Sequence, residues 1–269
     1  MLFVIYKNIK LYSVFLSKVR RRFNQQEVPH VKQGKDPKLS IIIPAFREVM
    51  NIPLLVREIA HDLKVHIPEW EVIIVDDDSR DGTVAICESL QKSGFPLKLV
   101  VRKNEQGLAT AVMEGFKHAR APIFVVMDGD LSHMPAAIPF LYEAIQNGAE
   151  FAMGSRYIPG GGTDDKWTFY RYLNSKVASL LARPLVVLSD PMSGFFALPR
   201  SLWTRCQGLS PVGYKIGLEL LVKCKPQNIK EIPIQFRSRV FGKSKLSIKQ
   251  QLLYLSHLRS LFVYKWRSD

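Results

Sequence analysis

Residues 123 to 133 read Ile-Phe-Val-Val-Met-Asp-Gly-Asp-Leu-Ser-His, an apolar run followed at once by two aspartates one residue apart. Such a run is typical of a strand buried on both faces, so Asp128 and Asp130 are expected at the end of a buried strand. Carboxylate oxygens are the ligands that Mg²⁺ and Mn²⁺ prefer, and a metal held by few side chains keeps open positions for phosphate oxygens. The stretch predicts a metal and diphosphate site, with a solvated turn as the alternative for so short a motif.

Apolar runs and amphipathic stretches alternate on both sides of this segment. A doubly wound α/β fold with a mostly parallel sheet is the expected result, because strands and helices in alternation build parallel sheets covered on both faces. Ligands of such folds bind at the carboxyl ends of the strands. The expected strands are Leu39 to Ile43, Glu71 to Val75, Leu97 to Val101 and Ile123 to Met127, and the expected helices are Asn51 to Lys64, Thr83 to Lys92, Gly107 to Ala119 and Pro135 to Asn147.

The segments that follow the first two strands contain no glycine-rich phosphate loop. Pro44 to Glu48 follows the first strand and Asp76 to Thr83 follows the second, and neither has the glycine spacing of a dinucleotide fold or of a P-loop. A nucleotide must therefore be held by other groups. The carboxylate of Asp77 can accept hydrogen bonds from a base or its ribose, and Phe46 can offer an aromatic wall. Asp81 is expected to cap the next helix.

The chain has 269 residues, 47% of them apolar, and a net charge of +14 that is concentrated at its ends. Residues 1 to 35 hold 8 Lys and Arg against one acid, residues 237 to 269 hold 8 against one, and the middle balances at 22 against 22. This length and composition suit a globular protein. Basic charge confined to apolar-rich ends favours an anionic membrane surface as partner over nucleic acid.

Both ends have helical spacing of apolar residues with lysine and arginine beside them. Residues 2–23 are interrupted by lysines and followed by an arginine cluster, which argues against a signal peptide or a spanning helix. We expect amphipathic helices in the membrane interface there and at residues 247–266, with packing on the domain as the alternative for each. The predicted domains are a membrane-surface segment and linker at 1–35, a catalytic domain at 36–246 and a C-terminal helix at 247–269.

The three cysteines, Cys87, Cys206 and Cys224, form an odd number without metal-like spacing. This pattern does not predict a disulfide framework, and reduced, cytosol-facing thiols are expected.

Six motifs in order carry a resemblance to a known family. They are Ile-Pro-Ala-Phe-Arg-Glu at 43–48, Val-Asp-Asp-Asp-Ser-Arg-Asp-Gly-Thr at 75–83, Asp-Gly-Asp-Leu-Ser-His at 128–133, Gly-Ser-Arg-Tyr at 154–157, Asp-Pro-Met-Ser-Gly-Phe at 190–195 and Arg-Val-Phe-Gly-Lys-Ser-Lys-Leu at 239–246. Over about residues 39 to 246 the chain resembles family 2 glycosyltransferases of the dolichol-phosphate mannose synthase type. The last motif is the most specific, since the others recur among sugar-nucleotide transferases.

The resemblance implies a glycosyltransferase A-type nucleotide-sugar fold and an inverting transfer of a hexose to a polyprenyl or dolichyl phosphate. It implies a nucleoside pocket, a site for Mg²⁺ or Mn²⁺ and the diphosphate, and a set of phosphate-binding cations. The nucleoside pocket would be formed by Pro44, Phe46, Glu48, Val75 and Asp77. The metal and diphosphate site would be formed by Asp128, Gly129, Asp130 and Ser132, and the phosphate-binding cations would be Arg156, Arg239 and Lys245. The metal ligands among them would be Asp128, Asp130 and Ser132. Phe46, Arg47 and Asp78 depart from the tyrosine, asparagine and glycine that are usual there.

The chemistry supports the same residues as catalytic groups. A sugar 1-diphosphate becomes a good electrophile when its leaving group is neutralised, which a divalent ion and fixed guanidinium groups achieve. A phosphate acceptor is already anionic near neutral pH and needs no strong general base. Asp128 and Asp130 would hold the metal, and Arg156, Arg239 and Lys245 would bring the two anions together.

GDP-mannose is the expected donor because the resemblance points there, and UDP-glucose is the alternative. A processive polysaccharide synthase is disfavoured because no Gln-Xaa-Xaa-Arg-Trp segment occurs, and a non-catalytic nucleotide-sugar-binding scaffold is disfavoured by the intact site residues. We expect the protein on the cytoplasmic face of a membrane, the endoplasmic reticulum in a eukaryote or the plasma membrane in a prokaryote, bound peripherally or through a small membrane-anchoring subunit.

Some residues keep two interpretations at this stage. His133 is either a helix-start polar residue or a ligand, and Glu219 either faces the acceptor or is solvated. Gly160 to Gly162 is either a mobile loop near the site or an inert turn. Met192 and Phe195 are expected to pack around a loop rather than to contact a cofactor.

Overall fold

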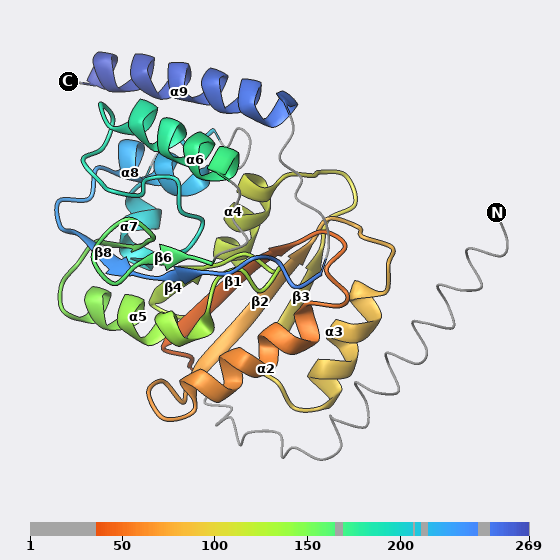
Figure 1. Ribbon diagram of the computed structural model, residues 1–269. Helices are drawn as coiled ribbons and strands as arrows, with labels where there is room; N and C mark the ends of the chain where they lie inside the picture. Colours follow the sequence, from red (N-terminus) through yellow and green to blue (C-terminus); the bar gives the residue numbers. More distant parts are fainter. Residues whose placement is uncertain (1–35, 165–168, 207, 211–214, 242–247, 269) are drawn as a thin grey trace, which may run out of the picture. The chain divides into compact units, whose positions relative to one another are not determined.

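The computed structural model describes residues 36–164, 169–206, 208–210, 215–241 and 248–268. Within them lies a seven-stranded sheet of order β3-β2-β1-β4-β7-β5-β8, with helices on both faces (Figure 1). The predicted doubly wound, mostly parallel α/β fold is thereby confirmed. The amphipathic segment expected at residues 2–23 lies outside the described residues.

The first half of the sheet follows the predicted alternation closely. All four predicted strands and helices are found, and their ends shift by only one or two residues, apart from a 3-10 turn that opens the fourth helix. Ile41 to Ile43 and Val72 to Val75 are completely buried because helices cover both faces of the sheet. The elements are β1 (Leu39–Ala45), α2 (Ile52–Leu63), β2 (Trp70–Asp76), α3 (Thr83–Lys92), β3 (Leu97–Val101), α4 (Leu108–His118), β4 (Ile123–Val126), η1 (Pro135–Ala137) and α5 (Ile138–Gln146).

The second half contains the one reversed strand of this sheet. Strand β7 pairs antiparallel with both β4 and β5, whereas β5 and β8 pair in parallel. The start of β7 therefore lies at the same edge as the ends of β4 and β5, which brings residues 190–195 to the predicted ligand edge. The elements are β5 (Phe151–Ser155), β6 (Gly162–Thr163), α6 (Phe169–Ala182), β7 (Phe196–Pro199), α7 (Arg200–Arg205), α8 (Ile216–Cys224), β8 (Ile229–Pro233), β9 (Gln235–Phe236) and α9 (Ile248–Ser268).

Two apolar cores lie on opposite faces of the sheet. Leu55, Ile59 and Leu141 from α2 and α5 pack into one core, while Val112 and Phe116 from α4 pack into the other. Helices α7 and α8 extend the second core, and α6 and α9 lie outside α8 (Figure 1). Gly115 is required in α4, because a Cβ there would clash with the side chain of Ile42 of β1.

Helix α9 packs on the domain, which confirms the alternative prediction for residues 247–266. Tyr254, Leu258 and Leu261 are buried in the second core, and the hydroxyl of Tyr254 donates to the carbonyl oxygen of Ala178 at 2.7 Å. Trp266 on the same helix is 87% exposed, so the helix also presents an apolar face to solvent. Among the described helices, none is both long enough and apolar enough to cross a bilayer.

A buried charged cluster lies under α9. Glu219 of α8 is fully buried and accepts hydrogen bonds from the ammonium of Lys223 and the backbone N–H of Ser210, both at 2.7 Å. The ring of His257 from α9 lies 3.4 Å from its other oxygen. Glu219 therefore faces neither the solvent nor the ligand edge, so both interpretations from the sequence are wrong. It joins α8 to α9 instead.

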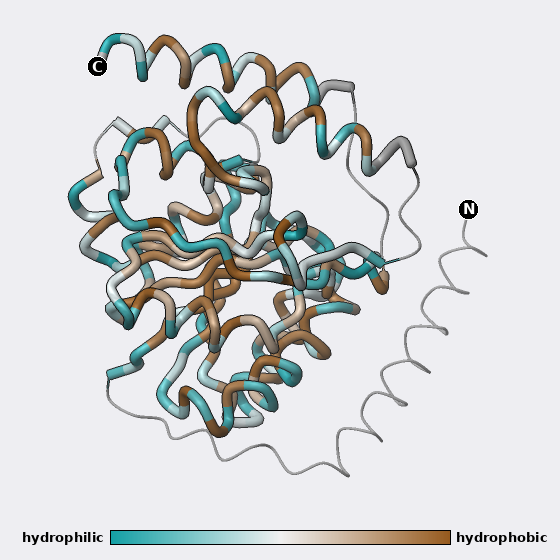
Figure 2. Tube along the Cα trace, turned by 60° about the vertical axis from the view of Figure 1, so that its left-hand side comes forward, coloured by the Kyte–Doolittle hydropathy of each residue, from teal (hydrophilic) through white to brown (hydrophobic). Residues whose placement is uncertain are grey.

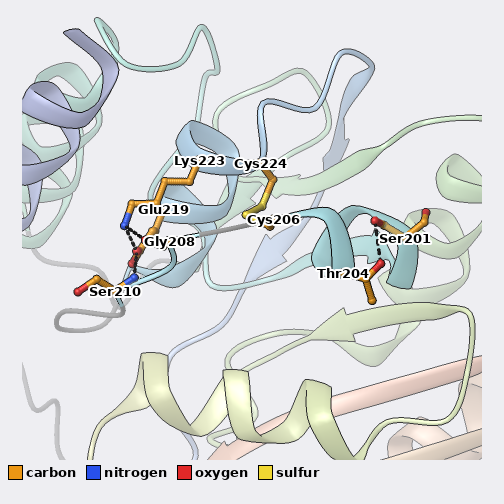
Figure 3. Close-up of a disulfide and its surroundings, with 8 residues drawn as sticks. All are labelled: Ser201, Thr204, Cys206, Gly208, Ser210, Glu219, Lys223 and Cys224. Carbon is orange, nitrogen blue, oxygen red and sulfur yellow. Dashed lines mark hydrogen bonds and ion pairs between the residues drawn. A yellow bond between two sulfur atoms is a disulfide. The ribbon is translucent and has the colours of Figure 1, made fainter. Parts of the chain in front are cut away.

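The structure corrects the expectation of three reduced thiols. Cys206, just after α7, and Cys224, at the end of α8, form a disulfide with their Cα atoms 4.8 Å apart (Figure 3). Cys87 is free and buried. An odd number of cysteines argues against a complete framework but does not exclude one bridge. The fold brings the two residues together, which their spacing of 18 in the sequence does not reveal.

Candidate active site

The two aspartates after β4 lie at the ligand edge in different environments. Asp130 is buried, and its Oδ1 accepts hydrogen bonds from the backbone N–H and the hydroxyl of Ser132 at 3.0 and 2.5 Å. Its Oδ2 lies 2.6 Å from Nε of Arg239. The side chain of Asp128 is 30% exposed. Leu131, which directly follows Asp130, has φ 64°, a strained left-handed conformation that turns the chain tightly at the site.

His133 holds this turn in place. Its Nδ1 accepts the backbone N–H of Asp128 at 3.0 Å, so its proton is assigned to Nε2. The ring is buried and stacks on Phe195 with centroids 5.0 Å apart. Burial is the main cause that lowers the pKa of His133, against the opposing charge of Asp128. The sequence left two interpretations of His133, a helix-start polar residue or a ligand. The buried ring does not fit the first, and its contact with the N–H of Asp128 positions the aspartate loop.

A residue that the sequence did not single out organises the end of β2. Arg102, which follows β3, donates from Nε and Nη2 to Oδ1 of Asp77 at 2.8 and 2.5 Å, and both side chains are less than a tenth exposed. The backbone N–H of Gly107 donates to Oδ2 of Asp77 at 2.9 Å. Arg102 also donates to Thr110 and to the carbonyl of Gly107. Asp77 is thus fixed in place, with one acceptor position left on Oδ2.

The end of β1 lies against the aspartate loop, as predicted. A Cβ at Gly129 would be 3.5 Å from the carbonyl oxygen of Pro44 and 3.7 Å from the side chain of Glu48. Glu48 accepts a hydrogen bond from Asn51 at 2.6 Å. Val75 is fully buried in the second core, so at this position the backbone rather than the side chain is available to a nucleoside.

Two departures from the family pattern share a backbone conformation. Arg47 and Asp78 have φ of 62° and 51°, in the left-handed region that asparagine and glycine adopt most readily. The chain compensates at both places. The backbone N–H of Arg47 donates to the hydroxyl of Ser79 at 2.8 Å, and Asp78 accepts from Nε of Arg80 at 2.8 Å.

Arg156 extends from the end of β5 into a buried ion pair with Asp190. Nε and Nη2 donate to the two carboxylate oxygens at 2.6 and 2.7 Å. Burial would lower the pKa of Arg156, but the contacts with Asp190 outweigh it and hold the pKa above its ordinary value. The guanidinium carbon also lies 5.4 Å from the ring centre of Phe236. The predicted phosphate-binding arginine is therefore a rigid, permanently charged group at the ligand edge.

Lys215, just before α8, is a second cation here that sequence reasoning missed. Its ammonium donates to the carbonyl oxygen of Met192 at 2.6 Å, in the loop before β7. Burial, and then the nearby charge of Arg156, lowers its pKa to about 8, while Asp128 and Asp190 oppose the shift. Lys215 belongs to no recognisable sequence motif. Only the fold reveals that it lies near Arg156.

The predicted residues thus fall into three groups. Asp130, Ser132 and Arg239 are in direct contact, Asp128 lies in the same loop, and Pro44 and Glu48 adjoin Gly129 of that loop. Asp77 and Arg156 lie at the ends of β2 and β5 at the same edge. Lys245 lies outside the described residues. Met192 and Phe195 are buried as predicted, and Gly162 belongs to strand β6, which pairs with β9. The N-cap of α3 is Gly82 rather than the expected Asp81, whose carboxylate lies one residue earlier and accepts the backbone N–H of Thr83 at 3.0 Å.

The donor set suits a divalent cation completed by phosphate oxygens. In the part of the chain that the structure describes, no three His, Cys, Asp or Glu side chains cluster as a ready metal cage. Asp128 and Asp130 supply carboxylate oxygens at one loop, and Oδ2 of Asp130 already has a cation, Arg239, as its neighbour. Mg²⁺ is commonly bound through one or two carboxylates together with substrate phosphates. These residues therefore fit such an ion with the diphosphate as the other ligand.

Comparison with known proteins agrees with this fold. Residues 40–203 match the glycosyl transferase family 2 domain. The chain is 41% identical over 238 residues to dolichol-phosphate mannosyltransferase of Saccharomyces cerevisiae, covering 86% of this chain and 89% of that protein. It is 40% identical to the protein of the same name from Mycosarcoma maydis, covering 86% of this chain and 81% of that one.

A solved structure shows the same architecture. The glucosyl-3-phosphoglycerate synthase of Mycobacterium tuberculosis, crystallised with Mn²⁺, uridine diphosphate and glucosyl-3-phosphoglycerate, superposes with a TM-score of 0.62 at 20% identity, covering 89% of this chain and 82% of that one. With the family match over most of the domain and two relatives at about 40% identity, the chain belongs to glycosyl transferase family 2 and is a glycosyltransferase.

Proposed function

We propose that this protein transfers mannose from GDP-mannose, with inversion, to the phosphate of dolichol or another polyprenol at the cytoplasmic face of a membrane. The proposal is supported by the two relatives named dolichol-phosphate mannosyltransferase. The structural observation that carries it is the meeting, at one sheet edge, of the carboxylates of Asp128 and Asp130 with the cations Arg156, Lys215 and Arg239. A site built in this way suits a reaction between two phosphate-bearing substrates.

The residues divide the chemistry between them. Mg²⁺ or Mn²⁺ bound at Asp128 and Asp130 would neutralise the negative charge of the departing diphosphate. Arg239 adds a guanidinium that can pair with two phosphate oxygens. Arg156 and Lys215 lie on the side of the loop before β7, where their charge can hold the acceptor phosphate. That phosphate is the nucleophile and already carries negative charge, so the site needs no strong base.

An apolar surface on α6 and α9 supports a membrane-bound acceptor. Figure 2 shows hydrophobic residues along both helices, which lie side by side in both views. The exposed apolar side chains are Tyr172, Leu173, Val177, Leu180, Leu181 and Val187 from α6 and the segment after it, and Leu252, Leu255, Phe262, Val263 and Trp266 from α9. Arg183, Arg259 and Arg267 are exposed on the same elements, and this mixture of apolar and basic groups suits an anionic bilayer surface.

The apolar surface is linked to the cations of the site. The hydroxyl of Tyr157, next to Arg156, donates to the hydroxyl of Ser175 in α6 at 2.8 Å. Lys176 of α6 lies 3.5 Å from the ring centre of Tyr157. A lipid phosphate approaching along α6 would therefore reach Arg156 while its hydrocarbon chain stays near the membrane. Peripheral binding by these helices, or recruitment by a small membrane-anchoring subunit, fits this arrangement.

UDP-glucose is the second candidate donor, and one observation favours it. Asp77 has a single acceptor position left after its contacts with Arg102 and Gly107. Uracil offers one N–H on its pairing edge, whereas guanine offers two adjacent donors, which pair best with two free carboxylate oxygens. The names of the relatives favour mannose as the transferred sugar, and the two proposals differ in a measurable way.

A donor panel tests both. GDP-mannose, UDP-glucose and UDP-N-acetylglucosamine, each radiolabelled in the sugar, are incubated with the full-length protein, polyprenyl phosphate and Mg²⁺ or Mn²⁺. Label in the lipid fraction from GDP-mannose supports the first proposal, and label from UDP-glucose supports the second. Absence of transfer from any donor, with nucleotide binding intact, would instead identify a non-catalytic nucleotide-sugar-binding protein.

A further inference from the structure

We propose that Arg239 occupies the cation position at Asp130 in the absence of donor and moves to the diphosphate when donor binds, so that metal binding and nucleotide binding are coupled through this one side chain. The inference rests on the proposed function only in requiring a divalent metal and a nucleoside diphosphate at this site.

The first step is the occupancy of the Asp130 carboxylate. Oδ1 is held by two hydrogen bonds from Ser132, so Oδ2 is the oxygen that faces outward. Oδ2 lies 2.6 Å from Nε of Arg239. The carboxylate is 5% exposed, and a buried charge of this kind is costly without an opposite charge beside it. Arg239 therefore neutralises Asp130 in the donor-free protein.

The second step is electrostatic exclusion. A divalent ion on Oδ2 would place two positive charges against a guanidinium a few ångströms away, with little water between them. Arg239 has to leave Asp130 before a metal can bind there with full affinity. Metal alone offers the arginine no new partner, whereas a bound diphosphate offers two oxygens in the geometry that a guanidinium fits.

The third step is reach. The backbone just before Arg239 is fixed beside the aspartate loop, because the N–H of Arg237 donates to the carbonyl of Ser132 at 2.9 Å. The hydroxyl of Ser238 donates to Asp164 at 2.8 Å. With its backbone anchored, the long side chain of Arg239, 28% exposed, can exchange partners by rotation about its own bonds. The exchange needs no rearrangement of the sheet.

The test measures Mn²⁺ binding directly, by the loss of the free-ion electron paramagnetic resonance signal, without sugar or acceptor. Arg239→Gln removes the competing charge, so we expect it to bind Mn²⁺ alone about tenfold more tightly than the wild type, the equivalent of one charge-assisted hydrogen bond. GDP or UDP should tighten Mn²⁺ binding strongly in the wild type and much less in Arg239→Gln, because coupling is reciprocal.

Two further variants make the outcome unambiguous. Arg237→Gln removes the same charge two residues away, where the side chain is exposed and the backbone contact with Ser132 is kept, so it should match the wild type. Asp130→Asn should abolish tight Mn²⁺ binding with or without nucleotide, which assigns the signal to this site. Both are compared after their thermal unfolding shows a folded protein.

The inference is overturned if Arg239→Gln binds Mn²⁺ alone no more tightly than the wild type and Arg237→Gln, or if nucleotide tightens Mn²⁺ binding equally in all three. Its outcome is separate from that of the proposed function, because no sugar is transferred in this measurement. A failed donor panel with the expected Mn²⁺ result would reject the reaction and keep the exchange.

Discussion

Arg156 and Asp190 are joined by two parallel contacts, at 2.6 and 2.7 Å, and their side chains are only 8% and 0% exposed. The backbone N–H of Arg156 donates to the same carboxylate at 3.1 Å. This pair connects the end of β5 to the loop before β7, so it fixes one wall of the site. Because both charges are buried, neither can lose its partner without leaving an uncompensated charge.

Asp190→Asn should therefore destabilise the fold strongly. We expect the free energy of unfolding to fall by about 3 to 5 kcal/mol, since the guanidinium of Arg156 stays buried without its counter-charge. Denaturant unfolding followed by circular dichroism measures this. The exposed pair of Lys38 with Glu69 gives the control, and Lys38→Gln should cost less than about 1 kcal/mol. Equal losses for the two variants would contradict the assignment.

Asp130→Ala should eliminate turnover with every donor. Loss of a group that stabilises developing charge costs roughly 10² to 10³ in rate, and here Arg239 would lose its partner as well. Transfer of radiolabel to lipid phosphate is the measurement. Glu88→Ala, which removes an exposed carboxylate from α3, should retain wild-type activity. Full activity after exhaustive chelation would count against a metal-dependent reaction.

Arg102→Lys should weaken nucleotide binding more than it slows the chemical step. Lysine keeps the charge but cannot reach Asp77, Thr110 and Gly107 together, so Asp77 loses its fixed orientation. We expect about tenfold weaker binding of the preferred nucleoside diphosphate by calorimetry, with kcat changed much less. Lys103→Met, next to it and exposed, is the matched control. A drop in kcat with unchanged nucleotide affinity would place Arg102 elsewhere in the mechanism.

The stability of the protein should rise with pH between about 8 and 10.5 because of Lys215. Burial lowers the pKa of Lys215 to about 8 in the fold from its ordinary value of 10.5, so in this window the unfolded chain binds a proton that the folded chain has released. Stability increases with pH wherever the unfolded state binds more protons. Lys215→Met lacks this group, and the difference in unfolding free energy between wild type and variant should change across the window. Parallel pH curves would show that Lys215 has an ordinary pKa.

Reduction should destabilise the protein measurably. The bridge between Cys206 and Cys224 closes a loop of 18 residues, for which the chain-entropy estimate is about 3 kcal/mol. Unfolding is compared with and without a phosphine reductant. The double variant Cys206→Ala, Cys224→Ala should be insensitive to the reductant and should resemble the reduced wild type. A Cys87→Ala variant should respond like the wild type, because Cys87 is not in the bridge.

The sheet and the aspartate loop could be predicted from the sequence because their signals are local. The apolar runs at 39–43, 71–75 and 123–127 mark strands covered on both faces, and the polar residues that follow them must share one edge. The pairing of Asp130 with Ser132 is likewise contained within three residues. The motif after β9 led to Arg239, and the fold places it beside Asp130 as one connected site.

The sequence could not show contacts between distant segments when the residues involved belong to no motif. Arg102 follows an ordinary strand, Lys215 precedes an ordinary helix, and each becomes part of the site only because other chain ends are brought beside it. The disulfide has the same origin, since residues 206 and 224 meet only when α7 and α8 pack. Helix α9 was predicted correctly as a helix, and its buried apolar residues have helical spacing, but the contact of His257 with the buried Glu219 of α8 joins distant segments and has no signal in the sequence.

The reversed strand β7 has a consequence for the evolution of this enzyme. It separates the strands β1 to β4, which lead to Asp77 and Asp130, from β5 and β8. The residues that we propose hold the acceptor, Arg156 with its partner Asp190, and Lys215, come from segments after β4. Both apolar cores contain residues from both sides of β7, so the two groups of loops share one scaffold although they are separate in sequence. Under the proposed function, substitutions in the loops beyond β7 can change acceptor binding while the aspartate loop after β4 stays the same.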